Sequence, residues 1–174
     1  MRYDFCFVGR LAQDTGIMIY LEALNILKKR GETYSLIICG DGPQLQEAKI
    51  FMETNKLEVD FLGFVKDPQS YVFQSKMVFV SRYLGILETL LAKKLIFAVY
   101  DSEIKKDYLE LAPFASLIVI EKDPVALANK ISYFANRPEK SRENIQNGFA
   151  WAKQQSWDKL TSQYLELWGK LKFR

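Results

Sequence analysis

Gly9 and Arg10 are the first residues of the chain whose types and placement could bind an anionic ligand. They stand at the end of a strand-like run over residues 3–9, in "FVGRL". Arginine carries a permanent charge and a planar fork of donors that suits phosphate oxygens, and glycine lets the backbone come close to a ligand. Taken alone, the pair fits a surface arginine after a tight turn equally well.

Residues 81–88, "SRYLGILE", form a second candidate segment. An apolar run ends at Ser81, a short turn containing Gly85 follows, and Glu88 stands in the first turn of an expected helix. Such a strand–turn–helix unit is a common place to hold a nucleotide or a phosphate. Glu88 either complements the positive end of its helix or accepts hydrogen bonds from sugar hydroxyls, and its position alone does not decide between the two.

Two glycine-containing segments follow further strand-like runs. In "CGDGP", Gly40 and Gly42 precede a helix that starts with proline, and in "FLGFV" a glycine interrupts a hydrophobic run just before Phe64 and Val65. The first segment fits a turn, and the second fits a bulge or close packing. Either segment could also present backbone groups to a nucleotide.

The composition bears on which kinds of site the chain can build. Its formal net charge of +3 is too small to indicate a nucleic-acid partner, and it contains no histidine. Its two cysteines, Cys6 and Cys39, belong to separate apolar runs. We therefore expect no metal site and no Ser–His or Cys–His nucleophile. No segment approaches the roughly 18–20 apolar residues that span a bilayer, and two cysteines without a CxxC motif fit a reducing compartment, so we expect a cytoplasmic protein.

Short apolar runs alternate with segments of helical period along the whole chain, which predicts an α/β fold. The expected strands cover residues 3–9, 34–40, 59–64, 76–81, 95–101 and 116–121. The expected helices cover residues 15–31, 43–56, 84–93, 103–111, 124–136, 139–153 and 156–172, with a short helical turn near 68–75. Strands that are apolar nearly throughout are typical of a parallel sheet covered on both faces. We expect one Rossmann-like, doubly wound domain over residues 1–174, with a mostly parallel six-stranded sheet.

In such a domain, ligands bind beyond the carboxyl ends of the strands, where the strand order reverses. If the order is 3-2-1-4-5-6, that crevice lies between the first and fourth strands. Its walls are then residues 9–16 and 81–88, so the two candidate segments are expected to face one another.

The order and spacing of these segments resemble the C-terminal half of GT-B glycosyltransferases of family 4, the retaining group-1 type. The resemblance covers nearly the whole chain. The matching runs are "FVGRL" with "YLEAL", "YSLIICGDGP", "VDFLGFV", "VFVSRY" with "LETLLAKKLIFAV", and "SWDKLTSQYLELW".

The resemblance implies a donor site for a nucleotide diphosphate sugar, with no metal or other cofactor. Gly9 and Arg10 match the motif whose arginine contacts the diphosphate, and Arg10 would stabilise charge on that leaving group. Glu88 matches the second glutamate of the family's E-x7-E motif, which commonly holds the donor ribose. The segments around Gly40–Gly42 and Phe64–Val65 match walls beside the nucleobase, and the donor-binding stretches include Thr15, Gly16, Ser81 and Gly85.

The chain departs from the family pattern at two places. The family usually has a lysine before the glycine that corresponds to Gly16, but here Thr15 stands there, with its hydroxyl as a weaker substitute. Asp14, just before it, is expected to cap the first helix and occupy its positive end. The family turn "EGFGLPLLE" is shortened here to "LGILE", so its first glutamate is missing. Lys105 and Lys106 are either substitute cations or part of a solvated face.

Catalysis in GT-B enzymes takes place between two domains, and the other domain recognises the acceptor. We therefore expect this chain to be a fragment or one subunit of a split enzyme, with any membrane contact in the other half. The terminal helix carries a stripe of Trp157, Leu160, Tyr164, Leu167, Trp168 and Leu171, most of which we expect in the core, with an exposed Trp168 fitting a missing partner.

Two alternatives to a donor-binding domain stay open. One is a non-catalytic GT-B-like scaffold or partner-binding subunit, which the lost lysine and the shortened turn favour. The other is a Rossmann domain for a different ligand such as NAD. The stretch after the first strand reads "GRLAQDTG" instead of G-x-G-x-x-G, which argues against the second alternative.

Overall fold

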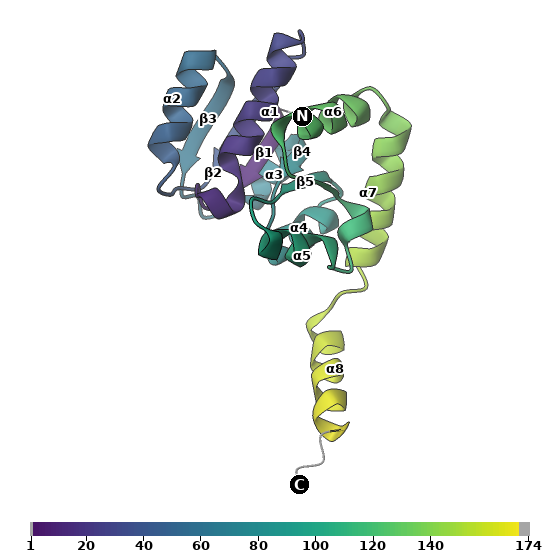
Figure 1. Ribbon diagram of the computed structural model, residues 1–174. Helices are drawn as coiled ribbons and strands as arrows, with labels where there is room; N and C mark the ends of the chain where they lie inside the picture. The colour runs from purple at the N-terminus through teal and green to yellow at the C-terminus, as the bar shows by residue number, and fades with distance from the viewer. Residues whose placement is uncertain (1, 171–174) are drawn as a thin grey trace.

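Six parallel strands form one sheet at the centre of the computed structural model, which describes residues 2–170 (Figure 1). The strands are β1 (Tyr3–Val8), β2 (Ser35–Cys39), β3 (Glu58–Gly63), β4 (Ser75–Phe79), β5 (Leu95–Val99) and β6 (Val119–Glu121). Their order is β3-β2-β1-β4-β5-β6, and every neighbouring pair is parallel. This is the order for which the crevice is expected between the first and fourth strands, and the reversal falls between β1 and β4.

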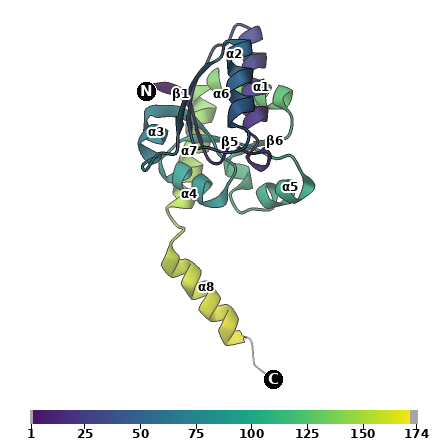
Figure 2. The same cartoon turned by 90° about the vertical axis from the view of Figure 1, so that its left-hand side faces the viewer.

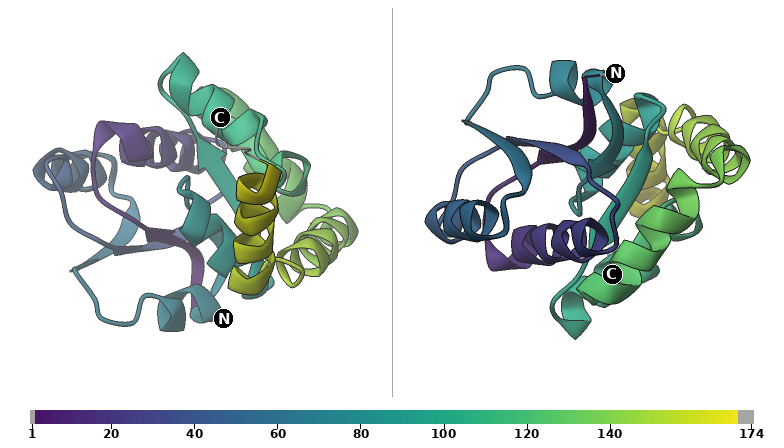
Figure 3. Two further views of the ribbon diagram at one scale, coloured as in Figure 1. Left: turned by 90° about the horizontal axis from the view of Figure 1, so that it is seen from below. Right: turned by 90° about the horizontal axis from the view of Figure 1, so that it is seen from above.

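Helices cover both faces of the sheet, as the apolar strands predict. On one face, α1 (Ile17–Lys29), α2 (Leu45–Asn55) and α6 (Pro124–Ala135) pack over the sheet. On the other face lie α3 (Gln69–Gln74), α4 (Tyr83–Leu91), α5 (Glu103–Glu110) and α7 (Pro138–Ala152). In Figure 3, α1 and α2 in purple and blue lie on the opposite side of the sheet from α7 in yellow-green.

Stacked aromatic rings fill the core beneath α1. The ring of Phe79 stacks on those of Phe5 and Tyr20, with centroids 4.3 Å apart in each pair. The Tyr20 hydroxyl is fully buried and donates a hydrogen bond to the Phe97 carbonyl oxygen at 3.1 Å. Burial raises the pKa of Tyr20 far above its ordinary value, so the hydroxyl stays protonated and fixes α1 against β5.

The last predicted strand is shorter than expected. Residues 115–117 form a single 3-10 turn, and only Val119–Glu121 pair with β5. The apolar run from 116 to 121 is therefore divided between a turn and an edge strand, which periodicity alone does not distinguish.

The terminal helix α8 (Trp157–Lys170) extends away from the α/β body, as Figures 1 and 2 show. Its predicted apolar stripe is present, but the side chains are exposed: Trp157 is 75% exposed and Trp168 is 59% exposed. The expectation that most of this stripe lies in the core is therefore wrong. Leu171 and Lys172, at the end of the predicted helix, lie outside the described residues.

Candidate functional site

The turns after β1 and β4 face one another across the point where the strand order reverses. The Ser81 hydroxyl donates a hydrogen bond to the Thr15 carbonyl oxygen at 3.4 Å. The Arg82 guanidinium lies 3.0 Å from a carboxylate oxygen of Asp14. The predicted walls of the crevice, residues 9–16 and 81–88, are therefore in direct contact.

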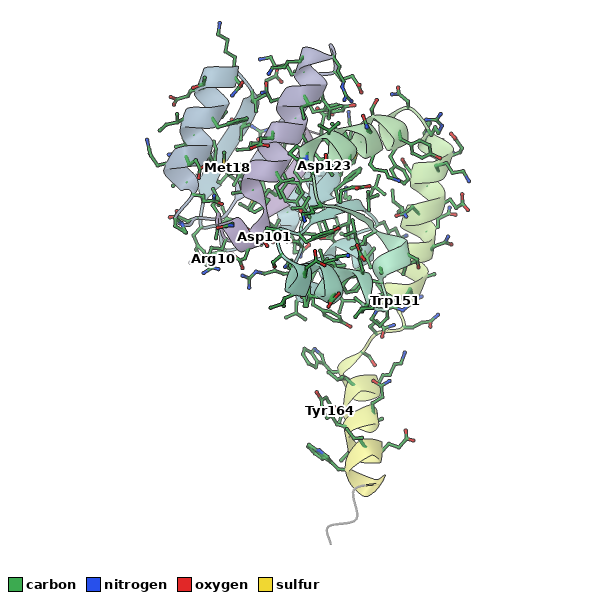
Figure 4. The ribbon with its side chains drawn as sticks, in the orientation of Figure 1. Arg10, Met18, Asp101, Asp123, Trp151 and Tyr164 are labelled. Carbon is green, nitrogen blue, oxygen red and sulfur yellow. The ribbon has the colours of Figure 1, made fainter. Side chains whose placement is uncertain are left out.

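A hollow of about 350 Å³ opens at the carboxyl ends of β1 and β2. It brings together residues that the sequence predicts as donor-binding from three separate turns: Gly9, Arg10, Gly40, Phe64 and Val65. The Phe64 side chain is 89% exposed, so its ring is free to contact a ligand. Figure 4 shows Arg10 at the lower edge of the α/β body.

Close backbone contact between the turns after β1 and β2 forms the floor of this hollow. A Cβ atom on Gly40 would overlap the carbonyl oxygen of Gly9, and one on Gly42 would overlap the carbonyl of Leu11. The Leu11 amide donates a hydrogen bond to the Asp41 carbonyl oxygen at 2.9 Å. Gly40 and Gly42 thus hold the two turns together, and Gly40 also lines the hollow.

Asp14 bridges two arginines instead of capping a helix. One of its carboxylate oxygens lies 2.9 Å from the Arg10 guanidinium, and the other lies 3.0 Å from that of Arg82. The N-cap of α1 is Gly16, whose φ is +75°, and no side chain caps this helix. The prediction that Asp14 caps α1 is therefore wrong.

The charge balance around Asp14 keeps its carboxyl group ionised. Partial burial opposes ionisation, but the hydrogen bond and charge of Arg10, with the charges of Arg82 and Lys105, outweigh it and lower the pKa of Asp14. The carboxylate therefore remains an acceptor for both guanidiniums at neutral pH.

Thr15 directs its side chain into its own turn. It is buried, and its hydroxyl oxygen lies within hydrogen-bond distance of the carbonyl oxygens of Arg10 and Ala12, the latter at 2.7 Å. The Thr15 hydroxyl thus faces these backbone carbonyl oxygens, whereas the sequence suggests that it contacts a ligand. Gly16 follows in the left-handed conformation, where a Cβ atom would overlap Val99. Both residues shape the turn after β1.

Glu88 lies deeper in its helix than the sequence suggests. Because α4 begins at Tyr83, Glu88 falls beyond the first turn and does not complement the helix N-terminus. Gly85 lies inside α4, as the expected helix over residues 84–93 places it, and not in a turn before Glu88. One carboxylate oxygen of Glu88 accepts a hydrogen bond from the Gln69 side chain at 2.9 Å.

Arg10 and Glu88 line different hollows. Glu88 belongs to a second one of about 380 Å³ between α4 and α8, which Leu84 and Trp157 also line. The hollow at β1 and β2 includes Arg10 and Pro68. Glu88 is hydrogen-bonded to Gln69, the residue after Pro68, but the two candidate catalytic side chains, Arg10 and Glu88, do not share either hollow.

The two candidate lysines are engaged in different ways. The Lys105 ammonium donates a hydrogen bond to the Ser81 carbonyl oxygen at 2.7 Å and lies 4.8 Å from the centre of the Tyr108 ring. Desolvation and the charge of Arg82 lower its pKa, although Asp14 and Asp101 act in the opposite direction. Lys106 pairs with Glu103 at 3.4 Å.

Arg82 was not recognised in the sequence as a site residue. The sequence feature that could have indicated Arg82 is the position of its positive charge directly after Ser81, at the carboxyl end of β4 and next to the expected crevice. Residues 2–170 contain no group of three or more His, Cys, Asp or Glu side chains arranged to hold a metal ion. Within the same residues, no helix has the length and apolar character needed to cross a membrane.

Residues 1–151 match the family of glycosyl transferases group 1. The chain belongs to this family, and its sheet and helices form a Rossmann-like domain of the GT-B type. The predicted family and fold class are both confirmed.

The chain is also similar to a curated enzyme of Campylobacter jejuni, the GalNAc-alpha-(1->4)-GalNAc-alpha-(1->3)-diNAcBac-PP-undecaprenol alpha-1,4-N-acetyl-D-galactosaminyltransferase. The two are 30% identical over 172 residues, which is 95% of this chain and 46% of that enzyme. This chain thus spans less than half the length of the relative.

Solved structures share the fold at low sequence identity. The C-terminal domain of the group 1 glycosyl transferase LpcC from Francisella tularensis superposes with a TM-score of 0.71 at 18% identity, covering 88% of this chain and 85% of that one. A mutant of TarM from S. aureus, in complex with fondaparinux, alpha-GlcNAc-glycerol and UDP, gives a TM-score of 0.73 at 18% identity and covers 96% of this chain and 36% of that one.

Proposed function

We propose that this chain is the donor-binding domain of a retaining glycosyltransferase that takes its sugar from a nucleotide diphosphate sugar. The observation that carries the proposal is the hollow at the carboxyl ends of β1 and β2, where Gly9, Arg10, Gly40, Phe64 and Val65 meet. These residues come from three turns far apart in the sequence. By the resemblance described above, these segments would be the ones that contact the donor.

Each part of the hollow suits one part of such a donor. The exposed ring of Phe64 offers a surface on which a base can stack, and Gly40 lines the same hollow with no side chain of its own. Arg10 supplies the positive charge for the diphosphate. A preorganised cation of this kind stabilises charge that develops on the leaving group, so Arg10 would act in the transfer step as well as in binding.

Glu88 would position the donor from the adjoining helix. Its carboxylate already accepts a hydrogen bond from Gln69, so the same group can accept hydrogen bonds from ribose hydroxyls. Gln69 follows Pro68, which lines the hollow, so this contact would lie at the edge of the proposed base site.

Uridine nucleotides are the first donors to test. The TarM structure contains UDP, and the curated relative transfers N-acetyl-D-galactosamine. We therefore propose UDP-linked N-acetylhexosamines as the leading donor class.

A second domain would supply the acceptor site, either in a longer chain or in a partner subunit. The curated relative is more than twice as long as the stretch that this chain matches. Helix α8 extends away from the body (Figure 4), and its exposed Trp157, Tyr164 and Trp168 offer a surface for that domain. Without it, the domain should bind donor but not transfer sugar.

Calorimetric titration with UDP, UDP-GalNAc and other nucleotide diphosphates tests the donor site. Loss of a charge-assisted hydrogen bond reduces affinity about tenfold or more, so Arg10→Gln should weaken UDP binding by that factor. Arg142→Gln, which removes an exposed arginine on α7, is the matched control and should bind as the wild type does. Failure of every nucleotide to bind, or equal binding by Arg10→Gln, would refute the donor site.

A non-catalytic scaffold is the second candidate, and the pairing of Arg10 with Asp14 favours it because a protein anion already engages the expected diphosphate contact. A thermal shift assay separates the two. A rise in melting temperature with UDP supports donor binding, whereas an unchanged melting temperature at millimolar UDP supports the scaffold.

A further inference from the structure

Arg82 and Arg10 approach one another through a single carboxylate at the crevice. The distances from Asp14 to the two guanidiniums are 2.9 Å and 3.0 Å, and each arginine takes a different oxygen of the carboxylate. Asp14 and Arg82 are 68 residues apart in the sequence, so the contact is made by the fold and not by local chain geometry.

We propose that Arg82 is the second cation of the diphosphate site, and that Asp14 occupies this site as an internal anion until a diphosphate displaces it. The inference rests on the proposed donor-binding function. It assigns to Arg82 the role that a lysine in the turn after β1 plays elsewhere in the family.

The geometry fits a diphosphate because of how guanidiniums bind oxygen anions. Each guanidinium has five N–H donors arranged in a planar fork, and Asp14 engages only one nitrogen of each. Two guanidiniums that converge on the two oxygens of one carboxylate also have the spacing to hold oxygens of neighbouring phosphate groups. The pair Arg10 and Arg82 is therefore an anion site whose present occupant is Asp14.

The surroundings strengthen the site for a ligand of higher charge. Asp14 lies in the 3-10 turn Gln13–Thr15 just before α1, a helix whose N-terminus no side chain caps. The positive end of a helix favours anions. Lys105, fixed on the Ser81 carbonyl oxygen, adds a third cation, which Asp101 partly offsets. A diphosphate brings more negative charge to this place than one carboxylate.

Other polar groups near the crevice suit this role less well. Thr15 stands where the family has its lysine, but its hydroxyl faces the turn. Lys106 is paired with Glu103 and lies on the next helix. Arg82, in contrast, is half exposed and already touches the partner of Arg10.

Calorimetric titration with UDP and with inorganic pyrophosphate tests the proposal on five proteins: the wild type, Arg10→Gln, Arg82→Gln, Asp14→Asn and the control Arg142→Gln. Arg82→Gln should weaken binding of both ligands about tenfold, since one charge-assisted contact is lost. Asp14→Asn should tighten binding about fivefold, because it removes a carboxylate that repels and competes with the ligand. Arg142→Gln should have no effect. Circular dichroism spectra confirm that the variants fold, which is expected because the side chains of Arg82 and Asp14 are half exposed.

The outcomes separate this inference from the proposed function. If wild type binds UDP and Arg10→Gln weakens it while Arg82→Gln does not, the donor site stands and the role of Arg82 is refuted. If Asp14→Asn binds UDP no better than wild type does, Asp14 is not the occupant of the site. If wild type binds neither ligand, both the donor site and the role of Arg82 fall.

Discussion

Replacing Phe64 with alanine tests whether the hollow at β1 and β2 receives a nucleobase. Phe64 follows β3 and lines the hollow together with Val65 and Gly40. Because its ring is 89% exposed, it contributes little to the core, and Phe64→Ala should leave the folded structure and its stability nearly unchanged.

The expected loss of affinity follows from the area that a stacked base would cover. An aromatic ring that goes from open exposure to one covered face loses roughly 40–80 Å² of apolar surface, which at about 25 cal/mol per Å² corresponds to about 1–2 kcal/mol. Measured base–aromatic stacking lies in the same range, about 1–3 kcal/mol per base. Phe64→Ala should therefore weaken UDP binding roughly fivefold to thirtyfold.

Isothermal titration of UDP and of inorganic pyrophosphate into both proteins measures this effect. The variant should lose affinity for UDP and keep its affinity for pyrophosphate, which has no base. Phe73→Ala is the control, because Phe73 on α3 is 61% exposed and does not line the hollow. Equal UDP affinity in wild type and Phe64→Ala, or an equal loss in Phe73→Ala, would refute the proposed base site.

Three further predictions concern the framework of the site. Gly16→Ala should lower the free energy of unfolding, measured in urea, by about 2–4 kcal/mol, because φ is +75° and a Cβ atom would overlap Val99. The control Gly31→Ala, where φ is +87° but the space is open, should cost only about 1 kcal/mol. Equal losses in the two variants would contradict the steric argument. Burial opposes ionisation of Asp4, but hydrogen bonds from Lys76 and Ser35 outweigh this effect and hold the pKa of Asp4 below the usual 3.8. The ionised carboxylate therefore stabilises the fold above pH 3.8, and this stabilisation is lost as the pH falls through the lowered pKa. Asp4→Asn should thus cost about 1–2 kcal/mol at pH 7, and the difference from wild type in urea denaturation should shrink toward pH 2; a constant difference would contradict it. Ending the chain after Ser156 should change the unfolding free energy by less than about 1 kcal/mol, since the α8 side chains are exposed, and a loss of several kcal/mol would show that α8 belongs to the core.

The sheet could be predicted because its signals are local. Runs such as Tyr3–Val8 and Leu95–Val99 are apolar nearly throughout, which is what a strand covered on both faces requires. The helices between them have a clear period, but the strand order depends on contacts between distant segments and entered the prediction only as a condition. The predicted and observed element boundaries differ where one apolar run contains two elements, as in residues 116–121, of which only Val119–Glu121 form a strand.

The candidate site could be predicted only in part, because its arrangement depends on contacts between distant segments. Glycines and Arg10 mark turns that meet at one hollow, but this hollow lies at the ends of β1 and β2 and after β3, and no residue of 81–88, the second predicted wall of the crevice at the switch point, lines it. The bridge from Asp14 to Arg82 joins side chains from two turns, so no local pattern indicates it.

The shortened segment 81–88 misled the prediction for a different physical reason. With few residues between β4 and the helix, α4 starts directly at Tyr83, and Glu88 moves beyond its first turn. Similarly, the apolar stripe of α8 indicates a face that prefers to be covered, but periodicity does not specify what covers it.

The central claim is that a nucleotide diphosphate binds at the carboxyl ends of β1 and β2. Backbone NMR of the isotope-labelled chain during a UDP titration tests it most directly. We expect the largest chemical-shift changes at Gly9, Arg10, Gly40 and Phe64, with smaller ones at Arg82. Changes confined to α6 and α7, or none at millimolar UDP, would contradict the claim.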